Sequence, residues 1–185
     1  GSNGYFERAF FLFDTSALGD TDTIDSATFS LYITTTFDQD NDAQAYMSCV
    51  STTPASNTVL ATGDFDQCGD AIDNPTEGIA TGDRLDITSI TGSAYNDMPL
   101  NATGLSWVDA TGITKLGMRE GHDIEDTPVA SGQANIVLIS MADQTGTSED
   151  PKLVVEHTAA VTDFLKSING LAKASIKSWN GVILD

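Results

Sequence analysis

The sequence predicts an all-β fold, an antiparallel β-sandwich of jelly-roll-like type with a short repeat segment at its C-terminus. Through residue 158 the chain holds about eight runs of strand-forming residues, separated by turns rich in Gly, Asp, Pro and Thr. No useful length of that part has helical periodicity. Of the 27 acidic residues, 21 are Asp, a turn residue, and 6 are Glu, a helix former. Two antiparallel sheets packed face to face are therefore expected, and both a jelly-roll and an immunoglobulin-like strand order fit.

The first two strands have different patterns. Residues 5–13 (YFERAFFLF) form a dense apolar run that ends in turn chemistry at residues 14–16. Such a run fits a strand buried on both faces, in which Glu7 and Arg8 would need polar partners. Residues 27–34 alternate between apolar side chains and Thr, Ser or Tyr, which is the clearest half-buried strand in the chain.

The remaining strands are expected at shorter apolar runs. These are residues 44–50, 86–90, 105–110, 113–119, 134–141 and 152–157. The stretch 51–82 is rich in Thr, Asp, Gly, Asn and Pro and is expected to be mostly loop.

The net charge of the chain limits the classes of molecule that it can bind. The chain has 185 residues, with 27 Asp and Glu against 8 Lys and Arg, so its net charge is −19. This balance argues against nucleic acid as a partner. No apolar run approaches the roughly 18–20 residues that span a bilayer, so membrane insertion is not expected.

The charge is unevenly distributed along the chain. The net charge of residues 1–151 is −20 and that of residues 152–185 is +1. We therefore expect a sandwich domain over residues 1–158 and a separate segment over residues 159–185.

Several segments resemble the DNRLRE-type β-sandwich domain. The opening segments are residues 8–16 (RAFFLFDTS) and 24–32 (IDSATFSLY), and the closing ones are 112–119 (GITKLGMR) and 150–156 (DPKLVVE). The resemblance spans roughly residues 5–158. It implies a jelly-roll-like module of extracellular, cell-surface or phage-associated proteins, some of whose relatives bind carbohydrate beside polysaccharide-degrading enzymes. It transfers no catalytic residues.

The family usually has strand sequence before the Arg-Ala-Phe-like run, whereas about four residues precede that run here. Either the chain is cut from a longer protein, or a neighbouring segment fills the missing position in the sheet.

The C-terminal segment contains an 11-residue tandem repeat. Residues 165–171 (LKSINGL) are followed by residues 176–182 (IKSWNGV), which match at Lys, Ser, Asn and Gly. A period of about 3.67 residues per turn suits one face of a helix, whereas Asn-Gly between apolar runs is a strong hairpin signal. Either structure must dock on the sandwich or on other copies to bury its apolar side. The expected assembly residues are Leu165, Ile168, Leu171, Ile176, Trp179 and Val182. The repeat resembles IKSINGLA-like repeats of phage tail-fibre-like and virion-associated sequences.

Two kinds of site could stabilise the loops. Cys49 and Cys68 would form a disulfide bond in an extracellular setting, and the alternative is two buried free thiols. Asp38, Asp40 and Asp42 place oxygen groups at alternate positions, as a Ca²⁺-binding loop does, although the pattern is not an EF-hand. The alternative is that these carboxylates are solvated turn residues.

Ligand-binding and catalytic groups are few. Tyr32 and Tyr46 are the aromatic residues that we expect to be exposed for stacking on a sugar ring. A histidine beside an aspartate, as His122 is beside Asp123, can act as a general base. No nucleophile motif accompanies this pair, so a polar loop histidine is the favoured interpretation.

We therefore expect a non-catalytic structural or adhesive module in an extracellular, cell-surface or virion setting. It would be one unit of a phage fibre, virion surface or filament, as a homo-oligomer or beside other domains of the same assembly. The alternative is a carbohydrate-binding module whose partner is a surface polysaccharide. A bound Ca²⁺ is the one cofactor expected.

Overall fold

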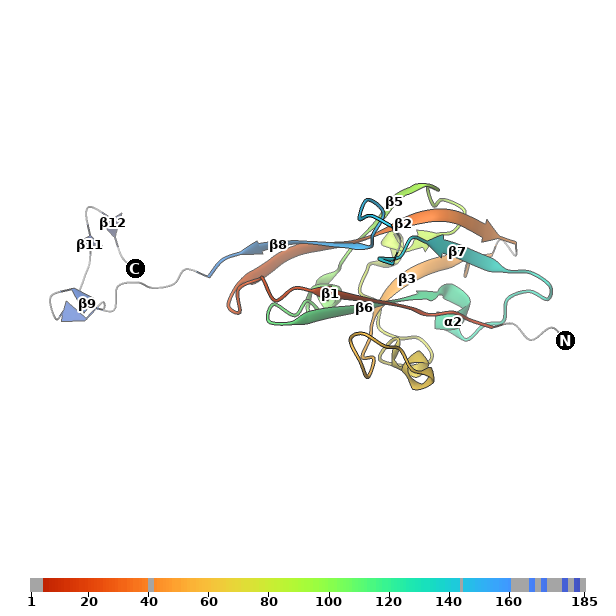
Figure 1. Ribbon diagram of the computed structural model, residues 1–185, viewed down its shortest axis with the longest axis horizontal. Coiled ribbons are helices and arrows are strands. Elements are labelled where there is room, and N and C mark those ends of the chain that lie inside the picture. Colours follow the sequence, from red (N-terminus) through yellow and green to blue (C-terminus); the bar gives the residue numbers. More distant parts are fainter. Residues whose placement is uncertain are drawn as a thin grey trace.

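The computed structural model describes residues 5–39, 42–143 and 145–160, together with the backbone of four short strands between residues 167 and 183. It is an all-β sandwich, as the sequence predicts. Figure 1 shows the two sheets packed face to face, with the chain entering at one end and β8 leaving at the other.

Sheet A contains β1 (Ala9–Asp14), β6 (Ile113–Glu120), β3 (Tyr46–Ser51) and β4 (Leu85–Asp86), hydrogen-bonded in that order. Sheet B is built around the long strand β2 (Thr23–Asp38). Strand β5 (Ala94–Pro99) pairs with one edge of β2, while β7 (Asn135–Ile139) and β8 (Lys152–Thr158) pair with successive parts of β2. All of these pairings are antiparallel.

The core lies between the inner faces of the two sheets. Phe29 is fully buried there and makes edge-to-face contacts with Phe11 and Phe13 of the opposite sheet. Its neighbours Leu31 and Ile33 are also fully buried, as the alternation over residues 27–34 predicts. From sheet A, Leu116 and Met118 complete this core.

Strand β2 carries two irregularities that curl sheet B. Its register shifts against β8 between Ile24 and Ser26, and against β7 between Ile33 and Thr35. In each case two steps along β2 oppose one step on the partner strand. Such bulges bend a strand and increase its twist. The second bulge also reverses which side chains face the core, because one extra residue changes the phase of a period of two.

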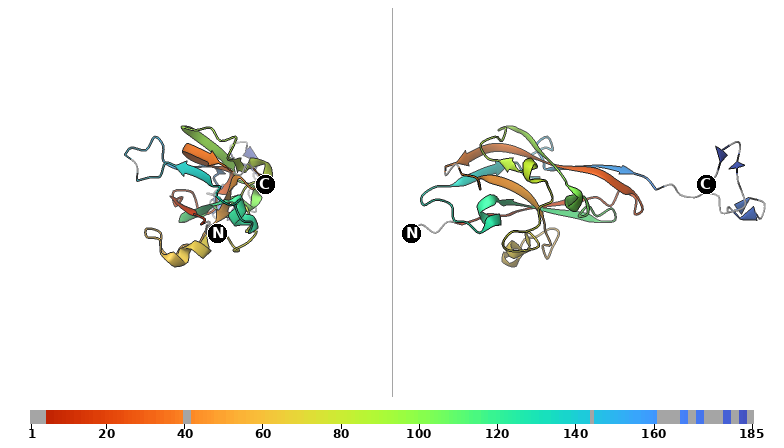
Figure 2. Two further views of the ribbon diagram at one scale, coloured as in Figure 1. Left: turned by 90° about the vertical axis from the view of Figure 1, so that its right-hand side faces the viewer. Right: turned by 180° about the vertical axis from the view of Figure 1, so that it is seen from behind.

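A long loop covers the outer face of sheet A. Residues 52–84 contain two 3₁₀ helices, η1 (Thr62–Gln67) and η2 (Thr81–Asp83), and lie outside the sheet in the end-on view of Figure 2. Sheet A is consequently buried on both faces, which explains why Ser48 and Val50 of β3, and Gly117 and Arg119 of β6, are buried beside the core residues between them.

Two predicted strands of the sandwich were wrong, and two further elements were not predicted. Residues 105–110 do not form a strand, because α1 (Ala102–Leu105) ends at Leu105 and turns follow it. The helix begins after Asn101, whose side chain accepts a hydrogen bond from the N–H of Gly104. Of residues 86–90, only Asp86 belongs to a strand, β4. Strand β5 was not predicted, because it contains Asn, Asp and Pro, which are uncommon in strands. The one-turn helix α2 (Gly121–Glu125) was not predicted either.

The C-terminal repeat forms strand pairs where its backbone is described. Strand β9 (Ser167–Ile168) pairs with β10 (Leu171–Ala172), and β11 (Ser178–Trp179) pairs with β12 (Val182–Ile183). Of the two structures that the repeat left open, these residues have the β form rather than the helix.

Candidate functional site

The densest group of buried charged side chains lies where β6 runs into α2. Strand β6 ends in Arg119 and Glu120, and α2 begins with Gly121, His122 and Asp123. All five residues are buried. Because neighbouring residues of a strand point to opposite faces, Arg119 faces the long loop outside sheet A and Glu120 faces the space between the sheets. The residues therefore divide into two polar clusters.

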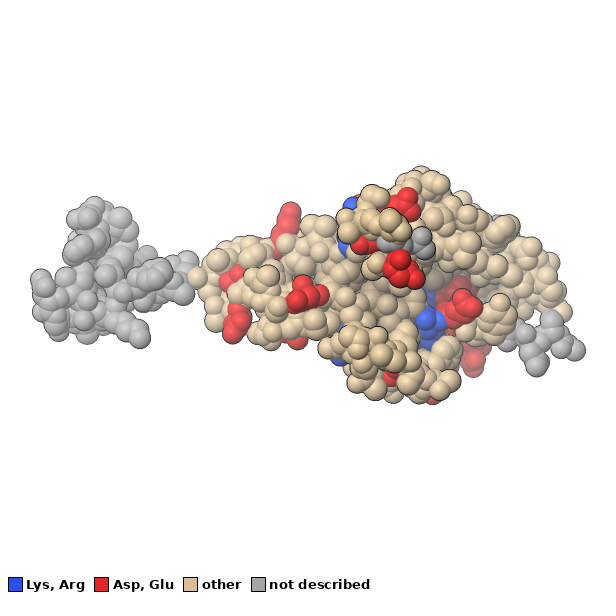
Figure 3. Space-filling model, viewed as in Figure 1, with Lys and Arg blue, Asp and Glu red and all other residues tan. Residues whose placement is uncertain are grey.

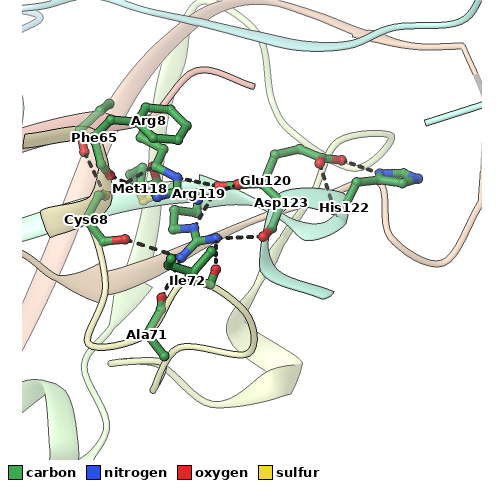
Figure 4. Close-up of polar contacts among 11 residues, drawn as sticks. Arg8, Phe65, Cys68, Ala71, Ile72, Met118, Arg119, Glu120, His122 and Asp123 are labelled. Carbon is green, nitrogen blue, oxygen red and sulfur yellow. Dashed lines mark hydrogen bonds and ion pairs between the residues drawn. The ribbon is translucent and has the colours of Figure 1, made fainter. Parts of the chain in front are cut away.

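The outer cluster joins two arginines to one carboxylate (Figure 4). Arg8, just before β1, donates two hydrogen bonds to Asp123, at 2.7 and 2.8 Å. Arg119 donates a third through Nε to Asp123 Oδ2, at 2.6 Å. The predicted need of Arg8 for a polar partner is thus met by a residue 115 positions away in the sequence.

The two guanidinium groups also hold the long loop. Arg119 donates to the carbonyl oxygens of Cys68, Ala71 and Ile72, at 3.3, 3.0 and 2.6 Å. Arg8 donates to the carbonyl of Phe65 at 2.8 Å and stacks over its ring, with 4.0 Å to the centroid. Charge-assisted hydrogen bonds of this kind are stronger than neutral ones. The outer cluster therefore fixes residues 65–72 against sheet A.

The inner cluster closes one end of the sandwich. Glu120 accepts hydrogen bonds from the backbone N–H of His122 at 2.7 Å and from Asn135 Nδ2 at 3.0 Å, so it joins sheet A to β7 of sheet B. His122 Nδ1 lies 2.8 Å from Glu120, and its Nε2 lies 3.2 Å from Asp42. His122 is thus a buried residue of α2 rather than a loop residue, and its ring contacts the carboxylates of Glu120 and Asp42.

The two cysteines are free thiols, so the predicted disulfide bond is not formed. Cys49 of β3 belongs to the core between the sheets and lies opposite Met118 of β6. Cys68 lies on the other face of sheet A, where its sulfur would be 2.6 Å from a Cβ placed on Gly117. The backbone of the sheet separates the two sulfur atoms, and Gly117 leaves the room that the Cys68 side chain needs.

We expect both thiols to be unreactive in the native protein. Burial raises the pKa of Cys68 to about 11 and also raises that of Cys49, so little thiolate exists at neutral pH. Titration with a thiol reagent should give no reactive cysteine in the folded protein and two after unfolding without a reductant. Fewer than two after unfolding would mean that the thiols are oxidised and would contradict this arrangement.

The predicted carbohydrate-binding tyrosines are not brought together. Tyr46 is 5% exposed, its hydroxyl donates to Glu125 at 2.9 Å, and Arg84 stacks on its ring at 4.1 Å. Burial raises the pKa of Tyr46. It therefore cannot stack on a sugar, and the prediction was wrong for this residue. Tyr32 lies on sheet B, half-buried beside Tyr95.

The predicted Ca²⁺ loop is only partly described. Asp40 lies outside the described residues, and Asp38 is partly buried at the end of β2. Asp42 accepts a hydrogen bond from the N–H of Gln44 at 2.9 Å and contacts His122. Among the described residues, no three His, Cys, Asp or Glu side chains form a group that could hold a metal ion. The Ca²⁺ site stays a prediction.

Two carboxylates make the long loop sensitive to acid. Backbone N–H groups of Ala55 and Ala61 donate to Asp64 at 2.9 and 2.7 Å and lower its pKa. The side-chain and backbone donors of Thr76 lower the pKa of Asp70. The pKa of each carboxyl group is lower in the folded protein than in the unfolded chain, so the ionised group stabilises the fold. This stability is present above about pH 4, and it is lost as the pH falls through the pKa of the folded state.

We therefore expect the free energy of unfolding to fall with pH below about pH 4. The Asp64→Asn variant should show a shallower fall than the wild type, whereas Asp66→Asn, at the exposed Asp66 of the same helix, should not. Denaturant unfolding at a series of pH values measures both. Equal slopes for the wild type and Asp64→Asn would show that Asp64 is not the responsible group.

Comparisons of the chain with protein-family models, with curated proteins and with solved structures find no match. The resemblance to the DNRLRE-type domain rests on the sequence segments given in the sequence analysis, and it stays a prediction. Among the described residues, no helix has the length and apolar character that crossing a membrane requires.

Sequence reasoning missed both polar clusters. Their members come from residues 8, 42, 119–123 and 135, and no local pattern links these positions. The one available signal was Arg8 inside an apolar run, because a buried arginine needs a polar partner. The sequence did not show which residue this partner is. Arg8 and Arg119 donate to protein oxygens of the loop and of Asp123, so the outer cluster stabilises the loop.

Proposed function

We propose that this chain is a non-catalytic structural or adhesive module of an extracellular, cell-surface or virion assembly, and that it self-associates through its C-terminal repeat. The observation that carries the proposal is the matching of the two strand pairs. Ile168 pairs with Leu171, and 11 residues later Trp179 pairs with Val182. Each copy of the sequence repeat thus corresponds to one hairpin, with Asn-Gly between the paired residues.

Such hairpins need a partner surface. A two-stranded hairpin is at best marginally stable in water, and these strands have two residues each. Repeated units that cannot bury an apolar side alone are stabilised by stacking on neighbours. Since the apolar residues recur at the same places in both copies, the repeat is suited to stacking on the repeats of other chains.

The charge distribution favours the repeat as the place where two copies meet. Residues 159–185 hold three Lys and two Asp, whereas residues 1–151 sum to −20. On the face shown in Figure 3, acidic side chains outnumber basic ones. A repeat that is less negative than the sandwich can approach a second copy with less repulsion, so assembly should strengthen as salt screens the sandwich.

Light scattering of the full chain tests the proposal. We expect a mass several times the 19.5 kDa of one chain, and Trp179→Asp should make the assembly smaller. Val59→Asp is the control, because Val59 is 69% exposed in the long loop. A monomer at high protein concentration, or equal effects of the two substitutions, would refute the role of the repeat. Repeating the measurement with EDTA shows whether Ca²⁺ contributes.

A second candidate function is carbohydrate binding, which an aromatic pair on sheet B favours. The rings of Tyr32 and Tyr95 meet edge to face with centroids 5.4 Å apart. The next opposed pair on the same face of the sheet, Ser30 and Asp97, is hydrogen-bonded at 2.7 Å. Aromatic rings beside hydroxyl and carboxylate groups suit the apolar face and the hydroxyls of a sugar.

Electrophoresis through gels that contain neutral or acidic polysaccharides tests this function. A binding module would be retarded, and Tyr32→Ala would abolish the retardation while Tyr5→Ala, at a tyrosine that is 83% exposed outside the sheets, would not. Unchanged mobility over a broad panel would exclude this candidate.

A further inference from the structure

One edge of sheet B presents uncovered apolar side chains. Strand β7 pairs with β2, and within the described part of the chain no strand pairs with its other edge. Ile136 and Leu138 of β7 are 41% and 50% exposed, and Phe37 of β2, directly opposite Ile136, is 52% exposed. We name these three residues the β7 stripe.

The bulge in β2 puts Phe37 in this stripe. Phe29, Leu31 and Ile33 face the core, and a regular strand would place Phe37 on the same face. The register shift between Ile33 and Thr35 reverses the alternation, so Phe37 points outward. The alternate residues Val137 and Ile139 of β7 still pack against the core. The exposed residues are therefore a surface feature of an otherwise ordered sheet.

The other edges of sheet B have the features that block pairing with a further strand. Strand β5 contains Asp97 and ends at Pro99, and β8 carries Lys152 and Glu156. Charged side chains and proline at an edge oppose the addition of another strand. Strand β7, with the sequence NIVLI, has neither. Its free edge combines unpaired backbone groups with apolar side chains, which is the usual template for strand addition.

We propose that the free edge of β7 pairs with β7 of a second copy of this chain, antiparallel and centred on Val137. In that register Asn135 lies opposite Ile139 of the second copy, and Ile136 opposite Leu138. The two copies of the β7 stripe then form one apolar surface across the interface, and the two B sheets become continuous. An interface of this kind is isologous, because the same patch is used by both copies.

The edge of β7 is a surface on which a second copy can pair despite the net charge, because the strand is uncharged and complementary to itself. Two chains of net charge −19 repel each other, so their contact must use a surface without charge. The stripe and all of β7 are uncharged, and an antiparallel self-pairing of NIVLI places no like charges opposite each other. The inference rests on the proposed function for self-association and adds to the repeat a second interface with its own residues.

Light scattering of four full-length chains tests the interface. Leu138→Lys places a charge in the stripe, and Val154→Lys is its control, because Val154 is 57% exposed on β8 of the same sheet. We expect Leu138→Lys to reduce the assembly and Val154→Lys to leave it unchanged. Trp179→Asp should leave a dimer of twice 19.5 kDa, and the double variant Leu138→Lys/Trp179→Asp should be a monomer.

These outcomes separate the two interfaces. A dimer that persists in the double variant, or a Val154→Lys chain that dissociates as much as Leu138→Lys, overturns the β7 interface. An unchanged assembly in Trp179→Asp overturns the role of the repeat and leaves the β7 interface to be judged by Leu138→Lys alone.

Cross-linking tests the register directly. Ile136→Cys and Leu138→Cys chains should be joined by a short thiol cross-linker when they are mixed, and each chain alone should give much less product, because position 136 lies opposite position 138. The native cysteines are buried and do not interfere. Equal yields from the mixture and from the separate chains would overturn the proposed register.

Discussion

The Arg119→Met variant is expected to lose about 3–5 kcal/mol of unfolding free energy, the typical cost of breaking a buried ion pair. Arg119 is fully buried and donates five hydrogen bonds, two of them to Asp123. Methionine can fill part of the volume, but it leaves the carbonyl groups of residues 68, 71 and 72 without their donor. Each buried acceptor left unpaired adds about 1–3 kcal/mol in the usual case, although these costs are not additive.

Lys115→Met is the matched control, since Lys115 lies on the same strand and the same face but is only partly buried. Urea unfolding measures both variants, and limited proteolysis reports on the loop. We expect Arg119→Met to become cleavable within residues 62–75 while the sheets persist, because the outer cluster holds that loop. A loss below about 1 kcal/mol in Arg119→Met would show that the cluster is not a main source of stability.

Patterns within one strand were predictable, whereas contacts between distant strands were not. The alternation over residues 27–34 predicts the burial of Phe29, Leu31 and Ile33, and the structure confirms it. The contact of Arg8 with Asp123 joins residues 115 positions apart, so it depends on the order of strands in sheet A. Sequence patterns of period two do not determine that order.

The wrong predictions have the same origin. Cys49 and Cys68 are close in sequence, but which face of sheet A each occupies depends on how the long loop crosses the sheet. Tyr46 lies in the predicted strand 44–50 and was expected to be exposed, yet α2 and Arg84 cover it. In both cases the covering segment lies outside the strand whose pattern was analysed, so local reasoning could not place it.

The second large effect is expected at Phe29, which lies on the opposite side of the bulge in β2 from Phe37. We expect Phe29→Ala to lose about 3–5 kcal/mol of unfolding free energy, as is typical when a buried aromatic ring is removed. Phe29 has no exposed surface and contacts the rings of Phe11 and Phe13. The cavity would lie between the two sheets, where neither sheet can close it without losing its other contacts.

Phe37→Ala is the matched control, with the same substitution on the same strand. Phe37 is 52% exposed, so the change in unfolding free energy should stay within about 0.5 kcal/mol. Both variants are best measured by urea unfolding in the Leu138→Lys background, in which pairing of β7 with a second copy does not contribute. If the strand alternated regularly to its end, Phe37 would face the core and the two substitutions would cost similar amounts. A large difference between them therefore reports on the register shift at Ile33 and Thr35, and with it on the outward direction of the side chains from which the β7 interface is built.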